Sequence, residues 1–328
     1  MGRLIEQSKY KYECITIDSG SEEASFLADL FGLDADFLIE EFVPANVRST
    51  EHDHLLDFIE QVIKAWMAGR IEIFATENAT MPTTVQLAQK AQRKFLEIHD
   101  ITTIDPFRIS NPGDALREIS RTIEWDLFRE YQRRERSVEL IRIVLGNNPV
   151  KMDAADIIRR LIDELPRIDA LMLSASQQRK SRAGYSYEHH IETMLSGGSI
   201  PFEKQVIIEA RKRPDFILPS LAFIDGKTEH ASTGLILSAK TTLRERWKQV
   251  EREKGARTLY LTTVDENIAG NAIEDMASIG VHLVIPESLK YTGQNRTNKT
   301  TEYAGHSNVL TFREFCDEVL SPNLPYWT

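Results

Sequence analysis

The chain has 328 residues, of which 41% are hydrophobic and 27% are charged, a balance typical of a folded globular protein with one large or two smaller domains. It has no apolar run long enough to span a membrane and no apolar signal core at its start, and its two cysteines, Cys14 and Cys316, are too far apart for a disulfide framework or a cysteine zinc site, so we expect a reduced, cytoplasmic setting. The net charge of −10 argues mildly against a protein that binds nucleic acid.

The first half of the chain is predicted to be mainly helical. Apolar residues recur at helical spacing over residues 22–31, 36–42, 51–68, 83–98, 114–145 and 152–165. Residues 70–76 alternate between apolar and polar side chains, which predicts a strand, and Pro166 is expected to end the last helix of this half. We therefore expect a mainly helical N-terminal region over residues 1–165.

The second half, residues 166–328, alternates between helical and strand patterns. Strands are predicted over residues 202–209, 215–218, 235–239, 259–263 and 281–285. Helices are predicted over residues 187–195, 244–253 and 268–279. This order predicts an α/β domain in which helices flank a mixed five-stranded sheet.

Acidic and basic side chains stand at the ends of two of these predicted strands. Asp215 begins one apolar run and Lys240 ends another, while Glu253 follows 13 residues after the lysine. Carboxylates can hold a divalent metal that assists phosphodiester hydrolysis, and Mg²⁺ needs only one or two of them. A lysine in a partly desolvated site can orient water or stabilise the transition state. The alternative is that these are ordinary surface residues.

A dense charged triplet, Arg244, Glu245 and Arg246, follows the lysine. Arginine can bond a guanine through O6 and N7, and glutamate can accept from cytosine N4, so the triplet could read base edges. The alternative is a solvated helix face. Further basic residues cluster at 179–182, 211–213 and 244–257, beside the candidate site residues, and would make DNA binding sensitive to salt.

Ser238, Lys240 and Glu253, preceded by the Pro214-Asp215 pair, resemble the displaced motif of one group within the PD-(D/E)XK nuclease superfamily. The group comprises type II restriction endonucleases that read CCGG or interrupted CC-N-GG sites (the NgoMIV, SsoII and EcoRII catalytic-domain group). The resemblance implies a restriction-endonuclease-like α/β core over residues 166–328. It also implies that Glu253 replaces the missing acid at Ser238, with Glu251 as a neighbouring alternative.

The resemblance also assigns roles upstream of the strand that begins at Asp215. Glu188 matches a helix glutamate that supports the metal site, and Gln177 or Gln178 matches a glutamine that contacts the minor groove. Arg244, Glu245 and Arg246 stand where related enzymes read C·G pairs. The alternatives are an ordinary helix carboxylate and a polar loop.

The resemblance implies a bacterial, Mg²⁺-dependent enzyme, with Mn²⁺ as a substitute, that cuts both strands of double-stranded DNA and leaves 5′-phosphate ends. A palindromic site implies a homodimer or a tetramer, and a cognate DNA methyltransferase would protect the same site. Residues 1–165 would add DNA contacts or dimerisation. Two alternatives remain: a nuclease without sequence preference, and a non-catalytic DNA-binding regulator on the same core.

Two other features admit more than one interpretation. Trp66, one turn before Arg70, could line a pocket for an extruded base, although a place in the core is the stronger expectation. His189 and His190 lack a third nitrogen or sulfur ligand at metal spacing. They are expected to lie on a helix surface or to contact DNA.

Overall fold

The computed structural model describes residues 2–7, 9–14, 57–206, 213–227, 229–243, 257–266, 268–291 and 302–327, without the side chains of 2–14, 175–181 and 183. The chain divides into two compact units, Met1–Ile63 and Lys64–Thr328. In the first unit, strands β1 (Gly2–Gln7) and β2 (Lys9–Cys14) pair antiparallel. The second unit contains a group of helices and a sheet. No helix among the described residues is long and apolar enough to cross a membrane.

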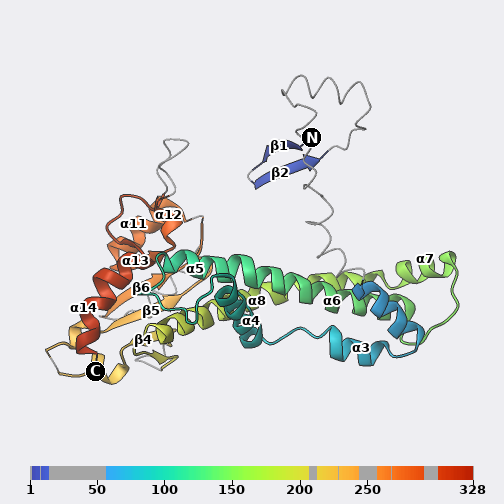
Figure 1. Ribbon diagram of the computed structural model, residues 1–328, viewed down its shortest axis with the longest axis horizontal. Coiled ribbons are helices and arrows are strands. Elements are labelled where there is room, and N and C mark those ends of the chain that lie inside the picture. Colours follow the sequence, from blue (N-terminus) through green and yellow to red (C-terminus); the bar gives the residue numbers. More distant parts are fainter. Residues whose placement is uncertain are drawn as a thin grey trace. The chain divides into compact units, whose positions relative to one another are not determined.

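The group of helices precedes the sheet in the sequence. They are α3 (Ile71–Asn78), α4 (Thr84–Ile98), α5 (Pro112–Glu118), the π-helical turn η1 (Ile119–Ile123), α6 (Glu124–Leu145), α7 (Ala154–Asp163) and α8 (Leu165–Gly197). The prediction for residues 83–98 is confirmed, because the Thr83 side chain accepts a hydrogen bond from Gln86 N and forms a capping box. Figure 1 shows α8 running beside α6 and on to the sheet.

Two predictions in the helical half are wrong. Residues 70–76 do not form a strand but belong largely to α3, which buries Ile71 and Phe74 at a spacing of three and leaves Ile73 exposed. Pro166 does not end a helix: α7 ends at Asp163, and Pro166 lies in the first turn of the 33-residue helix α8. Proline is tolerated there because the first N–H groups of a helix have no partner within it.

The sheet has six strands in the order β3-β4-β5-β6-β7-β8. They are β3 (Glu203–Lys204), β4 (Phe216–Leu218), β5 (Leu235–Ala239), β6 (Thr258–Thr262), β7 (Val281–Ile285) and β8 (Val309–Thr311). Strands β3, β4 and β5 pair antiparallel, whereas β5 to β8 pair parallel. The mixed α/β fold is confirmed, and the three-residue strand β8 is an addition to the five predicted strands.

Helices cover both faces of the sheet. On one face, Leu235 and Leu237 of β5 pack in a buried cluster with Tyr187 and Ile191 of α8. On the other face, Ile236 packs in a cluster that includes α11 (Gly270–Ser278). Each fully buried aliphatic side chain contributes about 1.5–3 kcal/mol relative to exposure. This packing fixes α8 against the strands that carry the candidate site.

The short elements at the C-terminal side complete this unit. They are α9 (Leu221–Ile224), the 3-10 turn η3 (Ala231–Thr233), α12 (Glu287–Tyr291), α13 (Phe312–Glu314), the π-helical turn η4 (Phe315–Leu320), α14 (Ser321–Asn323) and the 3-10 turn η5 (Leu324–Tyr326). Phe312, Phe315 and Trp327 are buried in the same cluster as α8. The C-terminal segment therefore closes the core on the α8 side of the sheet.

Candidate active site

Asp215 and Lys240 meet at one edge of the sheet. Asp215 directly precedes β4 and Lys240 directly follows β5, and the antiparallel pairing of Phe216 with Leu237 brings the two strand ends together. Asp215 Oδ2 accepts hydrogen bonds from Lys240 Nζ at 2.6 Å and from the backbone N of Ala239 at 2.8 Å. The two side chains are 13% and 22% exposed, so the ion pair is largely shielded from solvent yet still accessible.

The backbone of Lys240 is also fixed. Its N–H donates to the carbonyl of Thr262 at 3.0 Å, which extends the β5–β6 ladder by one residue beyond the strand. Thr262 is itself buried and its hydroxyl bonds Tyr187 Oη at 2.8 Å. The lysine therefore emerges from a rigid strand end, which limits the positions that its ammonium can reach.

Glu188 of α8 lies beside this pair. Burial and the negative charge of Asp215 raise the pKa of Glu188 to about 7, against the opposing influence of the cations Lys240 and Lys204. Because these charges influence Glu188, its carboxylate on α8 lies near the Asp215–Lys240 pair. A partly desolvated carboxylate held near another carboxylate is typical of a functional site.

The oxygen donors suit a hard divalent cation. Asp215 and Glu188 offer carboxylate oxygens, and Mg²⁺ is commonly held by one or two protein carboxylates with water completing its shell. Among the residues that the structure describes, no group of three or more His, Cys, Asp or Glu side chains could hold a metal ion. Glu253, the other expected ligand, and Glu251 lie outside the described residues.

A further cation, Lys204, borders the site and was not identified from the sequence. Its Nζ donates to Glu192 Oε2 at 2.7 Å, and His189 Nδ1 lies 3.2 Å from the same oxygen. Burial alone would raise the pKa of Glu192, but these hydrogen bonds and charges outweigh it and lower that pKa. The two-residue strand β3 places Lys204 opposite Phe216, next to Asp215. The sequence does not specify this register, so the proximity of Lys204 to Asp215 could not be predicted from it.

His190 forms a buried polar network with α4 and α6. The expectation that it lies on a helix surface is wrong, because the residue is completely buried. Its Nε2 lies 2.7 Å from Glu124 Oε2, its Nδ1 lies 3.0 Å from Gln92 Nε2, and Ser186 Oγ donates to Glu124 at 2.5 Å. The network joins helices α4, α6 and α8. Its two members on α8, Ser186 and His190, lie two residues before and two residues after Glu188.

The other expected site residues are not brought into this cluster by the described part of the chain. Arg244, Glu245 and Arg246 lie outside the described residues. Gln177 and Gln178 lie within α8, where the structure gives no account of their side chains. At the helical rise of 1.5 Å per residue, their backbone is about 15 Å from that of Glu188 along the helix.

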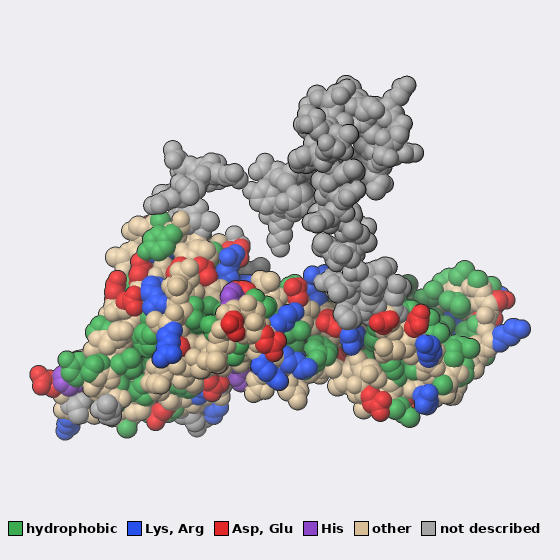
Figure 2. Space-filling view, in the orientation of Figure 1, with side chains coloured by type: hydrophobic (Ala, Val, Ile, Leu, Met, Phe, Trp, Pro, Cys, Tyr) green, Lys and Arg blue, Asp and Glu red, His purple; other side chains and the backbone are tan. Residues whose placement is uncertain are grey.

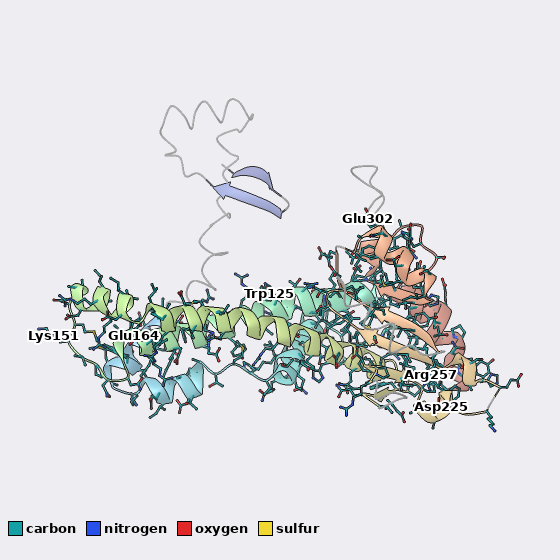
Figure 3. The ribbon with its side chains drawn as sticks, turned by 180° about the vertical axis from the view of Figure 1, so that it is seen from behind. Trp125, Lys151, Glu164, Asp225, Arg257 and Glu302 are labelled. Carbon is teal, nitrogen blue, oxygen red and sulfur yellow. The ribbon has the colours of Figure 1, made fainter. Side chains whose placement is uncertain are left out.

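Two basic residues of the predicted clusters, Arg257 and Arg182, have partners within the protein. Arg257 Nη2 donates to Asp225 Oδ1 at 2.5 Å, and Figure 3 shows both residues at the sheet end of the molecule. Arg182 Nη1 donates to the carbonyl of Pro82 at 2.5 Å. Trp66 is half-buried, and its Nε1 donates to the carbonyl of Gly146 at 2.9 Å. Figure 2 shows acidic and basic side chains interspersed on the visible face.

Comparisons with known proteins place this geometry in context. A family described as EcoRII C terminal matches residues 151–315. Type II restriction enzyme SsoII from Shigella sonnei is 27% identical over 225 residues, 65% of this chain and 69% of that protein. Type II restriction enzyme EcoRII from Escherichia coli is 37% identical over 143 residues, 42% of this chain and only 35% of EcoRII.

Solved structures share the fold. Metal-depleted Ecl18kI in complex with uncleaved, modified DNA superposes with a TM-score of 0.62 at 23% identity, covering 79% of this chain and 86% of that one. A complex of restriction endonuclease PspGI with substrate DNA gives a TM-score of 0.52 at 16% identity, covering 75% and 94%. At these identities the likeness concerns the fold.

Proposed function

The chain belongs to the EcoRII C-terminal family of restriction enzymes, and from this we propose that it cuts both strands of duplex DNA at a palindromic CCGG or interrupted CC-N-GG site. The products would carry 5′-phosphate and 3′-hydroxyl ends. Two type II restriction enzymes among its relatives support the reaction class. The contact of Asp215 with Lys240 at 2.6 Å, with Glu188 alongside, is the observation that supports the site most strongly.

The proposed mechanism assigns a separate role to each group. Asp215 and Glu253 would hold Mg²⁺, or Mn²⁺ in its place, and Glu188 would support them. The bound cation would supply charge neutralisation at the phosphorane and a more acidic water. Lys240, held by Asp215, would orient the attacking water or stabilise negative charge as it develops on the phosphate oxygens.

The raised pKa of Glu188 agrees with this assignment. In the protein without a cation, Glu188 carries a proton below about pH 7, because burial and Asp215 disfavour its charge. A divalent cation would compensate both negative charges and displace the proton. Cation binding would therefore relieve the electrostatic cost of holding Glu188 and Asp215 close together.

Sequence recognition would depend on the segment that follows Lys240. Arg244, Glu245 and Arg246 would read guanine and cytosine edges in the major groove, and Gln177 or Gln178 would contact the minor groove. A palindromic site would require a homodimer or a tetramer. Residues 1–165 would add DNA contacts or subunit contacts, and residues 166–328 would form the catalytic core. A cognate methyltransferase would protect the same site.

Digestion of a long plasmid of known sequence, followed by sequencing of the product ends, tests the proposal. With Mg²⁺ present, we expect discrete fragments that end at one palindrome containing CC and GG halves. Random nicking would retain the nuclease but overturn the proposed recognition. DNA binding without cleavage in either Mg²⁺ or Mn²⁺ would show a non-catalytic regulator.

A further inference from the structure

Three residues, Thr241 to Leu243, connect the proposed catalytic lysine to the proposed base-reading triplet. Lys240 is fixed by the sheet, since its N–H donates to Thr262 O at 3.0 Å. Arg244 follows Leu243 directly in the sequence. The contacts that fix residues 241–243 therefore set the direction in which the chain leaves β5 towards the triplet.

Arg121 contacts the first residue of this connection from the helical half of the unit. Its Nη2 donates to the carbonyl of Thr241 at 3.0 Å and to that of Val264 at 3.4 Å. These carbonyls lie just beyond the ends of β5 and β6. The guanidinium of Arg121 on η1 thus links the segments that follow the neighbouring strands β5 and β6, where the chain leaves the sheet.

Asp265 contacts the last residue of the connection. Its Oδ2 accepts the N–H of Leu243 at 2.8 Å, and Asp265 is only 7% exposed. The backbone of Asp265 is fixed in turn, because its N–H donates to Thr263 Oγ1 at 3.1 Å and its carbonyl accepts from Tyr303 Oη at 2.6 Å. The carboxylate is therefore presented from a rigid support.

Leu243 gives this contact a further anchor. Its side chain is completely buried among Ile236, Leu259 and Leu261, on the face of the sheet opposite α8. A buried backbone N–H needs a partner, and a carboxylate is a strong acceptor for it. The position and orientation of the residue before Arg244 are thus fixed through both its side chain and its backbone.

We propose that Asp265 and Arg121 are positioning residues that hold the chain between Lys240 and the Arg244–Arg246 triplet, so that base reading and cleavage share one rigid support. This inference rests on the proposed function of the triplet. Bidentate base contacts depend on direction as well as distance, so a loosened approach would lose discrimination before it lost phosphate contacts. Neither residue needs to touch DNA for this role.

The test uses the full chain and a plasmid library that carries a randomised window, so that the preferred site need not be known beforehand. Deep sequencing of the cut ends gives the rate at each sequence, and the preferred site is compared with its single-base variants. For Asp265→Ala we expect discrimination to fall on the order of ten-fold, as for the loss of one good base contact. Asp265→Asn keeps an acceptor oxygen for Leu243 N–H and should restore most of the discrimination.

Arg121→Gln provides a second variant in case Asp265→Ala folds poorly, since Arg121 lies at the surface. We expect it to lower discrimination less than Asp265→Ala does, because Leu243 stays anchored. The matched control is Arg117→Gln. Arg117 precedes Arg121 by one helical turn and pairs with Glu266, the neighbour of Asp265, at 2.5 Å; its partners in the described part of the chain are Glu266 and Ser288, not residues 241–243. Its discrimination should equal that of the wild type.

The outcomes separate this inference from the proposed function. If the wild type cuts at random or not at all, the proposed function fails. If the wild type is specific but Asp265→Ala slows cleavage equally at all sites, Asp265 is merely structural and the inference is wrong. If Arg121→Gln weakens binding uniformly and reduces its salt dependence, Arg121 contacts phosphate and does not position the chain.

Discussion

Helix α8 carries two polar clusters within five residues, and they differ in how well their charges are satisfied. Around Ser186 and His190, the carboxylate of Glu124 is buried and accepts from a hydroxyl and an imidazole. Glu188, between them in sequence, is near Asp215, and burial and the charge of Asp215 raise its pKa to about 7. A buried structural cluster provides its own partners, whereas a site built for a ligand leaves charge to be neutralised when that ligand binds.

The largest effect is expected when the cluster of Glu188, Asp215 and Lys240 loses the cation Lys240. Lys240→Met should slow single-turnover cleavage by about a thousand-fold, the scale seen when one transition-state stabilising group is removed. DNA binding should remain, because Lys240 is one cation among many. A Lys240→Met protein that is folded and cleaves at the wild-type rate would show that the catalytic site is elsewhere.

Removing the carboxylate of the buried cluster should instead affect folding. Glu124→Ala leaves His190 and Ser186 buried without their acceptor, so the free energy of unfolding should fall by about 3 kcal/mol. Urea denaturation measures it. The control is Glu118→Gln, which breaks the exposed Glu118–His99 contact and should cost less than about 0.5 kcal/mol. Equal losses of unfolding free energy in the two variants would show that the buried contacts of Glu124 stabilise the fold no more than the exposed Glu118–His99 contact does.

Neutralising Glu188 should have opposite effects on stability and on metal binding. A carboxyl whose pKa is raised in the folded state loses stability as pH rises from its unfolded pKa, about 4.5, to about 7, and remains penalised above that. Glu188→Gln removes the penalty, so the metal-free variant should be about 1–2 kcal/mol more stable than the wild type at pH 8, after allowance for partial exposure. At pH 4.5 the difference should disappear.

The same carboxyl predicts how metal binding depends on pH. Below about pH 7 a cation must displace the proton of Glu188, so its apparent affinity should rise up to about ten-fold per pH unit and level off above pH 7. Titration of Mn²⁺ into the free protein across this range measures it. Glu188→Gln should bind Mn²⁺ more weakly and without that slope. The same slope in the variant would assign the titration to another group.

The smallest effect is expected at Lys204. This cation lowers the pKa of Glu188, so Lys204→Gln should raise that pKa further and shift the pH dependence of Mn²⁺ binding to higher pH. The loss of its 2.7 Å contact with Glu192 should change the stability little, because the pair is partly exposed. A shift to lower pH would contradict the electrostatic account of the site.

Strands β5 and β7 could be predicted because local sequence determines them, and the Asp215–Lys240 contact follows once β4 and β5 pair. Residues 235–239 and 281–285 are short apolar runs, and the structure places β5 and β7 over those residues. Acid and lysine at the ends of antiparallel neighbours must meet once the strands pair. To predict that the two side chains lie close together, it is enough to know that β4 and β5 are neighbours, and no detail of side-chain packing is needed.

The rest depends on tertiary packing that periodicity does not show. The polar stretch before Glu188 hides the continuity of α8, which buries apolar residues against α6 near its start and against the sheet near its end. The burial of His190 depends on Glu124, which is 66 residues away in sequence. Lys204 borders the site only through its register with Phe216. Each of these requires contacts between segments that are distant in sequence.

The most direct measurement compares Glu188→Gln with Glu124→Ala in parallel, by single-turnover cleavage and by urea unfolding at pH 8. The account predicts that Glu188→Gln loses cleavage by at least about a hundred-fold while its metal-free stability rises. Glu124→Ala should lose stability yet cleave within about ten-fold of the wild type where it remains folded. Wild-type cleavage by Glu188→Gln, or a loss of its stability, would contradict the assignment of Glu188 to the catalytic cluster.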